Sequence, residues 1–197
     1  ILAGGLGPDN VAEAIRAGEL LKVVLARALV ISSDRTPDAF DIVEQLADEH
    51  PGCYVYGWRR GDASFIGASP ELLVSLIEGR VRSVPFAGTA PRGRNGAEDT
   101  QIAARLLDSA KDQQEHTIMV DDILGRMGPL TTSVAASEPA VERFRHVQHL
   151  VTHIEGSPAN GISVLGFAGA LHPTPAVGGV PLEEALAAFE QGVALTR

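Results

Sequence analysis

The sequence has little cysteine, no excess of basic residues and no long apolar segment. Cys53 is the only cysteine, so neither an intrachain disulfide nor a cysteine-based metal cluster can form, and a reducing cytoplasm is expected. No uninterrupted apolar run is long enough to span a bilayer, and the first residues lack the basic start and apolar core of a signal peptide. With 16 basic and 25 acidic residues, the formal net charge of -9 disfavours binding to nucleic acid or to an anionic membrane surface. A small anionic substrate is not excluded, because local charge and metal ions decide its binding.

The composition is that of a folded globular protein. Apolar residues make up 45% and charged residues 21% of the 197 residues, which argues against disorder and is enough for a sizeable core. The sequence contains no repeat, no low-complexity tract and no Ser/Gly-rich linker. These features predict one α+β unit with a mixed or antiparallel sheet.

Local patterns predict the secondary structure. Gly61 and Gly79 mark turns between short strands, as in an antiparallel meander, whereas Gly128 and Pro129 end the longest helical stretch. Thr36 is the expected cap of the second helix. Helices are predicted over residues 11–17, 37–50, 98–127, 160–171 and 181–195. Strands are predicted over residues 22–31, 54–59, 63–67, 72–77, 80–84, 131–136 and 146–154.

Lys22 begins a segment that is otherwise rich in apolar residues, KVVLARALVI. A lysine at the end of a strand usually extends its ammonium group into water. Alternatively, the amine is partly buried, and desolvation then lowers its pKa until it can act as a base. The residues alone leave both interpretations open.

Glu71 closes the segment GASPE, residues 67–71. A turn between two strands with a solvated glutamate is the ordinary interpretation. The functional alternative is a general acid beside a pocket. Gly88, in the segment PFAGT, has the same ambiguity: it belongs either to a flexible turn or to a backbone N–H that an anionic ligand approaches closely.

Asp108, Asp112 and Glu115 are spaced by four and three residues, so on one continuous helix their carboxylates share a face. A solvated acidic face is the usual explanation of such a pattern. A magnesium site is the alternative, because Mg²⁺ prefers oxygen ligands and one or two carboxylates suffice.

Six motifs in a fixed order resemble the chorismate-utilising enzyme family. They are KVVLAR, FIGASPELL, PFAGTAPR, AKDQQEH, VQHL and LHPTPAVGG. The family includes anthranilate synthase, aminodeoxychorismate synthase, salicylate synthase and isochorismate synthase, and the resemblance covers residues 19–181. It implies a partial chorismate-binding domain over residues 1–197, with the anthranilate synthase component I-like fold: mixed or antiparallel sheets flanked by helices, incomplete in this chain. It also implies chorismate as substrate, Mg²⁺ as cofactor and a monomer.

The resemblance assigns a role to each matching residue. Lys22 corresponds to the base that deprotonates an attacking water, and Glu71 to the general acid that protonates the departing ring hydroxyl. Glu115 corresponds to a magnesium ligand, and Asp112 would be a weaker or indirect ligand. The residues that match substrate contacts are Gly88, Thr89, His149 and Ala176.

Two positions bear on the activity within the family. Ammonia-using members carry Gln where this chain has Lys22, so Lys22 indicates that water is the nucleophile. Members that go on to eliminate pyruvate carry Thr at the position of Ala176. Both residues favour an isomerase that forms isochorismate for a siderophore (2,3-dihydroxybenzoate) or menaquinone pathway. The alternatives are a salicylate synthase and a truncated, non-catalytic relative.

The sequence departs from the family after Pro181. The family's glycine-rich segment with paired glutamates, which supplies the second metal ligand and a substrate-binding lysine, is not found. A protein ending at Arg197 would therefore be expected to have half a site and little activity.

Overall fold

The computed structural model describes residues 18, 20–24 and 29–187 of the chain. The predicted helix over residues 11–17 lies outside this part, as does the predicted helix 181–195 beyond residue 187; residues 182–187 are helical. The helices are α2 (Ala39–Glu49), α3 (Gly96–Asp108), α4 (Ala110–Met127) and α5 (Val164–Leu171), with a 3-10 turn η1 (Gly128–Leu130). The strands are β1 (Lys22–Val23), β2 (Tyr54–Arg60), β3 (Ala63–Ser69), β4 (Leu72–Ile77), β5 (Arg80–Val84), β6 (Phe86–Pro91), β7 (Thr131–Ala136), β8 (Ala140–Arg143), β9 (Val147–Val151), β10 (Ile154–Pro158) and β11 (Gly179–Val180).

All strand pairings among the described residues are antiparallel, which confirms the predicted α+β class. The largest sheet has the order β4-β5-β10-β7, and a second has the order β6-β9-β8. Two smaller units are the hairpin β2-β3 and the ribbon β1-β11. The predicted turns at Gly61 and Gly79 are confirmed, and both glycines have positive φ, a conformation that few other residues adopt readily. Among the described residues, no helix combines the length and the apolar character that a membrane crossing requires.

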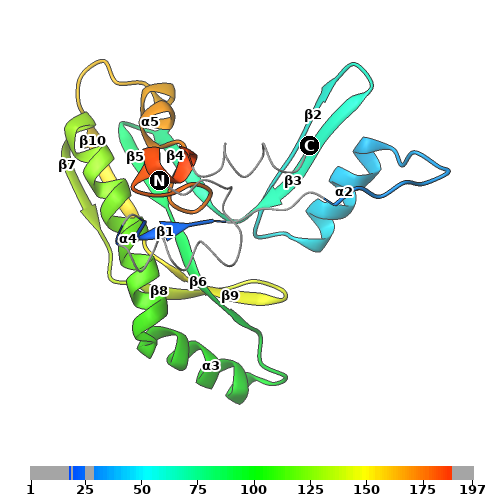
Figure 1. Ribbon diagram of the computed structural model, residues 1–197, viewed down its shortest axis with the longest axis horizontal. Coiled ribbons are helices and arrows are strands. Elements are labelled where there is room, and N and C mark those ends of the chain that lie inside the picture. The colour runs from blue at the N-terminus through cyan, green and yellow to red at the C-terminus, as the bar shows by residue number, and fades with distance from the viewer. Residues whose placement is uncertain (1–17, 19, 25–28, 188–197) are drawn as a thin grey trace.

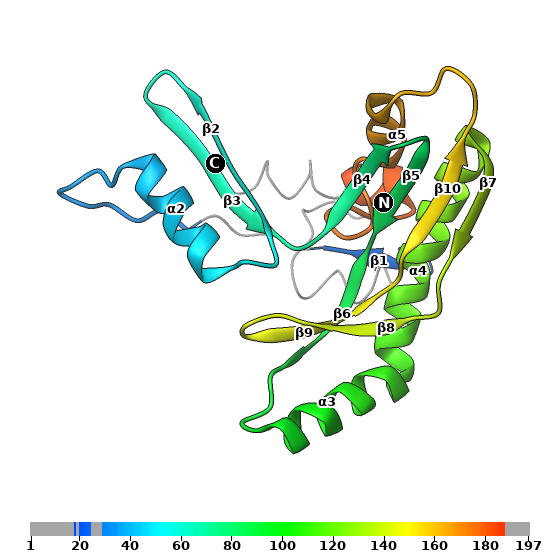
Figure 2. The same ribbon diagram turned by 180° about the vertical axis from the view of Figure 1, so that it is seen from behind.

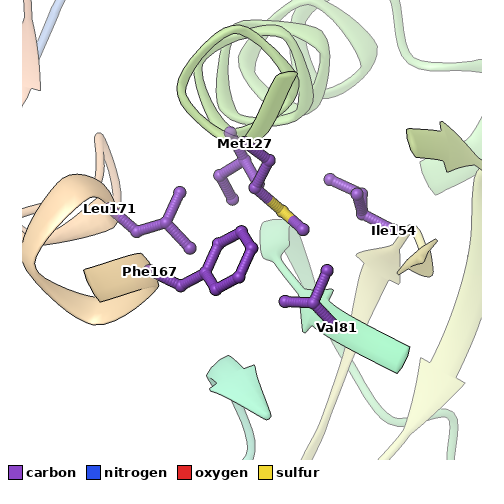
Figure 3. Close-up of a cluster of buried hydrophobic side chains, with 6 residues drawn as sticks. Val81, Met127, Ile154, Phe167 and Leu171 are labelled. Atoms are coloured by element: carbon purple, nitrogen blue, oxygen red, sulfur yellow. The ribbon is translucent and has the colours of Figure 1, made fainter. Parts of the chain in front are cut away.

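The core lies between α4, α5 and the four-stranded sheet (Figure 3). Met127 at the end of α4 points toward Phe167 and Leu171 of α5, and Val81 and Ile154 face them from β5 and β10. These side chains are almost fully buried; burial of each stabilises the fold by roughly 1.5–3 kcal/mol. The C-terminal half of α4 is thereby anchored, and its first half packs against β6.

The prediction of a single helix over residues 98–127 is wrong, because this segment forms the two helices α3 and α4. Ser109 has an extended backbone, ends α3 and begins α4, and its side chain accepts a hydrogen bond from the Asp112 N–H. Capping by serine competes with continuation of a helix, because the hydroxyl replaces the backbone acceptor. Asp108 therefore belongs to α3, and it does not share a helical face with Asp112 and Glu115.

The predicted strand over residues 22–31 is confirmed only at Lys22–Val23. Residues 25–28 lie outside the described part, and Leu29, Val30 and Ile31 are exposed and in no strand. An apolar pattern becomes a buried strand only where another strand pairs with it, and β1 pairs with β11 at two positions.

Three other predicted boundaries differ from those in the structure. Residues 146–154, predicted as one strand, are split between β9 and β10, which belong to different sheets. The segment PFAGT, interpreted as a turn, forms most of β6 and pairs with β9. The cap of α2 is Asp38 rather than Thr36, since the Asp38 side chain accepts from the Phe40 N–H.

Helix α2 and the hairpin β2-β3, together called the arm, lie to one side of the other sheets in both views (Figures 1 and 2). Helix α2 covers one face of the hairpin, and Val43 packs so closely over Gly57 that a Cβ there would lie 2.9 Å from it. The opposite face carries four exposed aromatic side chains: Tyr54, Tyr56, Trp58 and Phe65.

Candidate active site

One cavity collects seven of the eight residues singled out from the sequence. Its volume is about 410 Å³, within the roughly 300–1,000 Å³ usual for small-molecule sites. We call it the site cavity. The predicted residues that line it are Lys22, Glu71, Gly88, Thr89, Glu115, His149 and Ala176, and its other lining residues are Val24, Ser69, Pro70, Phe86 and Ala87.

Each part of the fold contributes one piece of this wall. Lys22 comes from β1, Glu71 from the connection between β3 and β4, and Glu115 from α4. Strands β6 and β9, paired in one sheet, supply the middle of the wall. Ala176 lies in the connection between α5 and β11. A larger cavity of about 770 Å³ adjoins the site cavity at Pro70 and Phe86, but none of the eight predicted residues lines it. The site cavity is therefore the better candidate.

Lys22 and Glu115 form an ion pair, with 3.0 Å between Nζ and Oε1. The Lys22 side chain is 13% exposed and that of Glu115 is 39% exposed. The Lys22 side chain is thus partly buried rather than extended into water.

Glu71 has the protonation behaviour that a general acid needs. Burial raises the pKa of its carboxyl group to about 7, against the opposing effects of a hydrogen bond with the Phe86 backbone and of the nearby Lys22 charge. A carboxyl group with this pKa keeps a substantial protonated fraction at neutral pH, about half at pH 7, and can donate a proton. The Ser69 hydroxyl accepts a hydrogen bond from the Glu71 N–H and shapes the turn.

Gly88 lies at a bulge where the pairing of β6 with β9 shifts register. Its φ of 74° is in the left-handed region. A Cβ at this position would lie 3.1 Å from the Cβ of Asp112 and 3.3 Å from Leu150. Glycine is therefore required here by backbone conformation and by close packing, and the segment is not a flexible turn.

Thr89 and His149 face each other across the same pair of strands. The Thr89 hydroxyl is hydrogen-bonded to Nδ1 of His149 at 2.9 Å. Burial lowers the pKa of His149, a shift opposed by a hydrogen bond with the Gly88 backbone. The ring of Phe86 packs edge-on against His149, with 5.9 Å between the centroids. Phe86 lines the cavity and was missed from the sequence, although it belongs to the PFAGT motif.

Asp112 lies outside the site cavity. It lines a neighbouring cavity with Thr89 and Arg105, and its backbone N–H is used by the Ser109 cap. No group of three or more His, Cys, Asp or Glu side chains arranged to hold a metal occurs in the described residues. Glu71 and Glu115 are the acidic residues that line the site cavity, so the described residues do not form a complete metal site by themselves.

The comparisons with known proteins identify the family of this chain. The sequence profile described as "Chorismate binding enzyme" matches residues 9–197, and the chain therefore belongs to the chorismate-binding enzyme family. It is 37% identical over 191 residues to the salicylate biosynthesis isochorismate synthase of Pseudomonas aeruginosa, covering 96% of this chain and 40% of that protein. It is 39% identical over 179 residues to anthranilate synthase component 1 of Aeropyrum pernix, covering 88% and 40% of the two chains.

A solved structure shows the same fold. The crystal structure of a Bacillus anthracis protein assigned as the 2,3-dihydroxybenzoate-specific isochorismate synthase DhbC superposes with a TM-score of 0.86 and 36% identity. The match covers 91% of this chain and 50% of that one. This chain spans about two fifths of the length of the two curated relatives above.

Proposed function

We propose that the site cavity is part of a chorismate site, in an enzyme that converts chorismate into isochorismate. The observation that carries the proposal is Glu71, a cavity-lining carboxyl group whose pKa of about 7 suits a general acid. Lys22 lines the same cavity and is the proposed base. In the proposed reaction a water loses a proton to Lys22 and adds to the ring, and the departing ring hydroxyl takes a proton from Glu71 and leaves as water. The net change is an isomerisation.

The choice of water as nucleophile is supported by particular residues rather than by overall identity. The similar proteins include an isochorismate synthase and an anthranilate synthase at 37% and 39% identity, so identity does not separate the two activities. Lys22 and Ala176, which both line the cavity, are the residues expected where water attacks and pyruvate is retained.

Glu115 is proposed to hold Mg²⁺, with the remaining ligands from the substrate, from water or from residues outside the described part. The metal would neutralise a substrate carboxylate and orient it. Glu115→Gln should weaken the binding of Mg²⁺, so that added Mg²⁺ no longer strengthens chorismate binding. The thermal unfolding of the protein should stay nearly unchanged. If the unaltered protein binds chorismate equally well with Mg²⁺ and with excess chelator, this assignment is contradicted.

Product analysis tests the proposal. The protein is incubated with chorismate and Mg²⁺, the products are separated by chromatography, and pyruvate is measured by a coupled assay. Isochorismate with little pyruvate is the expected result, and Lys22→Gln should lower its formation by roughly 10² or more. Salicylate with an equal amount of pyruvate would identify a salicylate synthase instead. Anthranilate formed from added ammonia would overturn the role of Lys22.

A non-catalytic role is the second candidate. It is favoured by one observation: the described residues gather fewer than three side chains able to ligate a metal at any point. A folded protein that binds chorismate and forms no product would support this candidate.

A further inference from the structure

The part of the cavity wall that carries Lys22 and Ala176 belongs to neither of the larger sheets. Within the described residues, β1 and β11 pair only with each other, at Lys22↔Val180 and Val23↔Gly179. A two-stranded ribbon of this length is not stable alone. Its position beside the cavity must therefore come from contacts with the rest of the molecule.

One such contact is made by Arg126, in the last turn of α4. Its Nη1 donates to the carbonyl oxygen of Pro173 at 3.2 Å and, at 3.5 Å, to that of Ala170. Its Nη2 donates to Oδ1 of Asp122 at 2.9 Å. The carbonyl of Ala170 lies in the last turn of α5, where helical acceptors have no partner within the helix. The Arg126 side chain is 22% exposed.

From Pro173 the chain continues directly into the cavity wall. The carbonyl of Thr174 accepts hydrogen bonds from the N–H groups of Val177 and Gly178, and its hydroxyl accepts from the Ala176 N–H. This turn holds Ala176 in place. The Gly178 carbonyl in turn accepts from the Val24 N–H at 3.0 Å.

Lys22 in β1 is held against β11 by the hydrogen bonds of its neighbours in the chain. The Leu21 N–H donates to the carbonyl of Val180 at 2.7 Å, so hydrogen bonds to Val180 and to Gly178 flank Lys22 on its two sides. A Cβ on Gly179 would lie only 2.4 Å from the Lys22 carbonyl oxygen, which shows how closely the two strands approach. Residues 173–180 and β1 thus form one continuous unit, which we call the wall segment.

We propose that Arg126, oriented by Asp122, is a positioning residue that ties the wall segment to α4. Helix α4 also carries Glu115, which pairs with Lys22. The helix therefore contacts the wall segment at two points, Glu115 in its first half and Arg126 in its last turn. An exposed ion pair between residues i and i+4 contributes little, but Arg126 differs because its other acceptors are carbonyls of a second element.

Amide hydrogen exchange tests this role without any need for catalysis. In Arg126→Met, the hydrogen-bonded amides of residues 176–178 and of Leu21 and Val24 should exchange about tenfold faster. Amides of β7 and β10 should change less than about twofold. Arg94→Met is the matched control, because Arg94 pairs with Glu98 in the same i, i+4 arrangement and its side chain is 90% exposed. Arg126→Lys keeps a cationic donor and should restore slow exchange in part.

Three results would overturn the role. Unchanged exchange of residues 176–178 in Arg126→Met would show that the wall segment is held by other contacts. Equally faster exchange in β7 and β10 would show an effect on overall stability instead. A lysine variant as fast as the methionine variant would argue against donation to the Pro173 carbonyl as the cause.

The expected effect of Arg126→Met on chorismate binding rests on the proposed function. By calorimetry, Arg126→Met should weaken chorismate binding about tenfold, whereas Arg94→Met should not change it. If the unaltered protein binds no chorismate, the proposed function fails, and hydrogen exchange still decides the role of Arg126. If exchange accelerates and chorismate affinity stays the same, the wall segment is not part of the binding site.

Discussion

At the scale of single residues, the clearest chemical signal is the environment of Glu71. A glutamate in a turn is ordinarily solvated and ionised at neutral pH. Here burial raises its pKa to about 7, and the side chain lines the same cavity as Lys22. The pair therefore offers a proton donor and a candidate base to one ligand, which is the requirement of a reaction that moves a hydroxyl group.

Glu71→Gln is expected to lower turnover by roughly 10² to 10⁴. Glutamine keeps the shape of the side chain but cannot give a proton to a leaving hydroxyl. Chorismate affinity should change much less than turnover. The rate of isochorismate formation, measured with a parallel calorimetric titration, checks both statements. Near-normal turnover would mean that Glu71 is only a turn residue.

The raised pKa of Glu71 also predicts a pH-dependent stability. The folded protein holds this proton up to a pH of about 7, whereas the ordinary pKa is 4.5. Between these two values the folded state binds more protons than the unfolded state, so the free energy of unfolding falls as the pH rises. The loss attributable to this group is on the order of 2–3 kcal/mol. Urea unfolding at pH 4.5 and pH 7.5 measures it.

Glu71→Gln is the control for this measurement. The variant cannot ionise at this position, so it should be more stable than the unaltered protein at pH 7.5 and similar to it at pH 4.5. Parallel pH profiles of the two proteins would show that Glu71 is not desolvated in the folded state.

At the scale of elements, the junction of α3 and α4 separates Asp108 from the acidic residues of α4. Ser109 ends one helix and caps the next. Asp108 consequently belongs to α3, whereas Asp112 and Glu115 lie on α4, where Glu115 lines the site cavity and Asp112 a neighbouring one. A continuous helix would have placed Asp108, Asp112 and Glu115 on one face.

Ser109→Ala should destabilise the protein by about 1 kcal/mol, because the cap on the Asp112 N–H is lost. The shift in the urea midpoint measures this change. Ser64→Ala, at an exposed position on β3, is the matched control and should have almost no effect. A Ser109 variant as stable as this control would mean that the helix break is set by packing of α3 and α4 rather than by the cap.

At the scale of the whole molecule, the arm presents an aromatic face that no described residue covers. Tyr56 and Phe65 stack on it with 5.7 Å between their centroids, beside the exposed Trp58. Exposed apolar patches of this kind often mark surfaces that contact another protein segment.

Trp58 is the single tryptophan and is 63% exposed, which makes this face directly observable. Its fluorescence should resemble that of an indole in water and should be strongly quenched by acrylamide. Trp58→Phe should remove the signal and leave the unfolding midpoint nearly unchanged. A blue-shifted emission with weak quenching would show that a second copy or another segment covers the face in solution.

Much of this protein was determined by local sequence. The strands β4, β5 and β7 have the predicted bounds. The turn at Gly79 joins β4 directly to β5, so each of these two strands finds its pairing partner next to it in the sequence. The six motifs were sufficient to identify the family, and seven of the eight predicted residues meet in one cavity. These motifs are contiguous, so their residues can be recognised without knowing how the chain folds.

Long-range packing decided the contacts between residues that are distant in the sequence, and the environment of Glu71. The Lys22–Glu115 pair and the Thr89–His149 hydrogen bond join residues far apart in the chain, and only strand pairing and the position of α4 bring them together. The predicted strand is not formed at Leu29, Val30 and Ile31 for the same reason, since an apolar run needs a partner to pair with. Burial also set the pKa of Glu71, because the desolvation of a carboxyl group depends on every element packed around it and not on its neighbours in sequence.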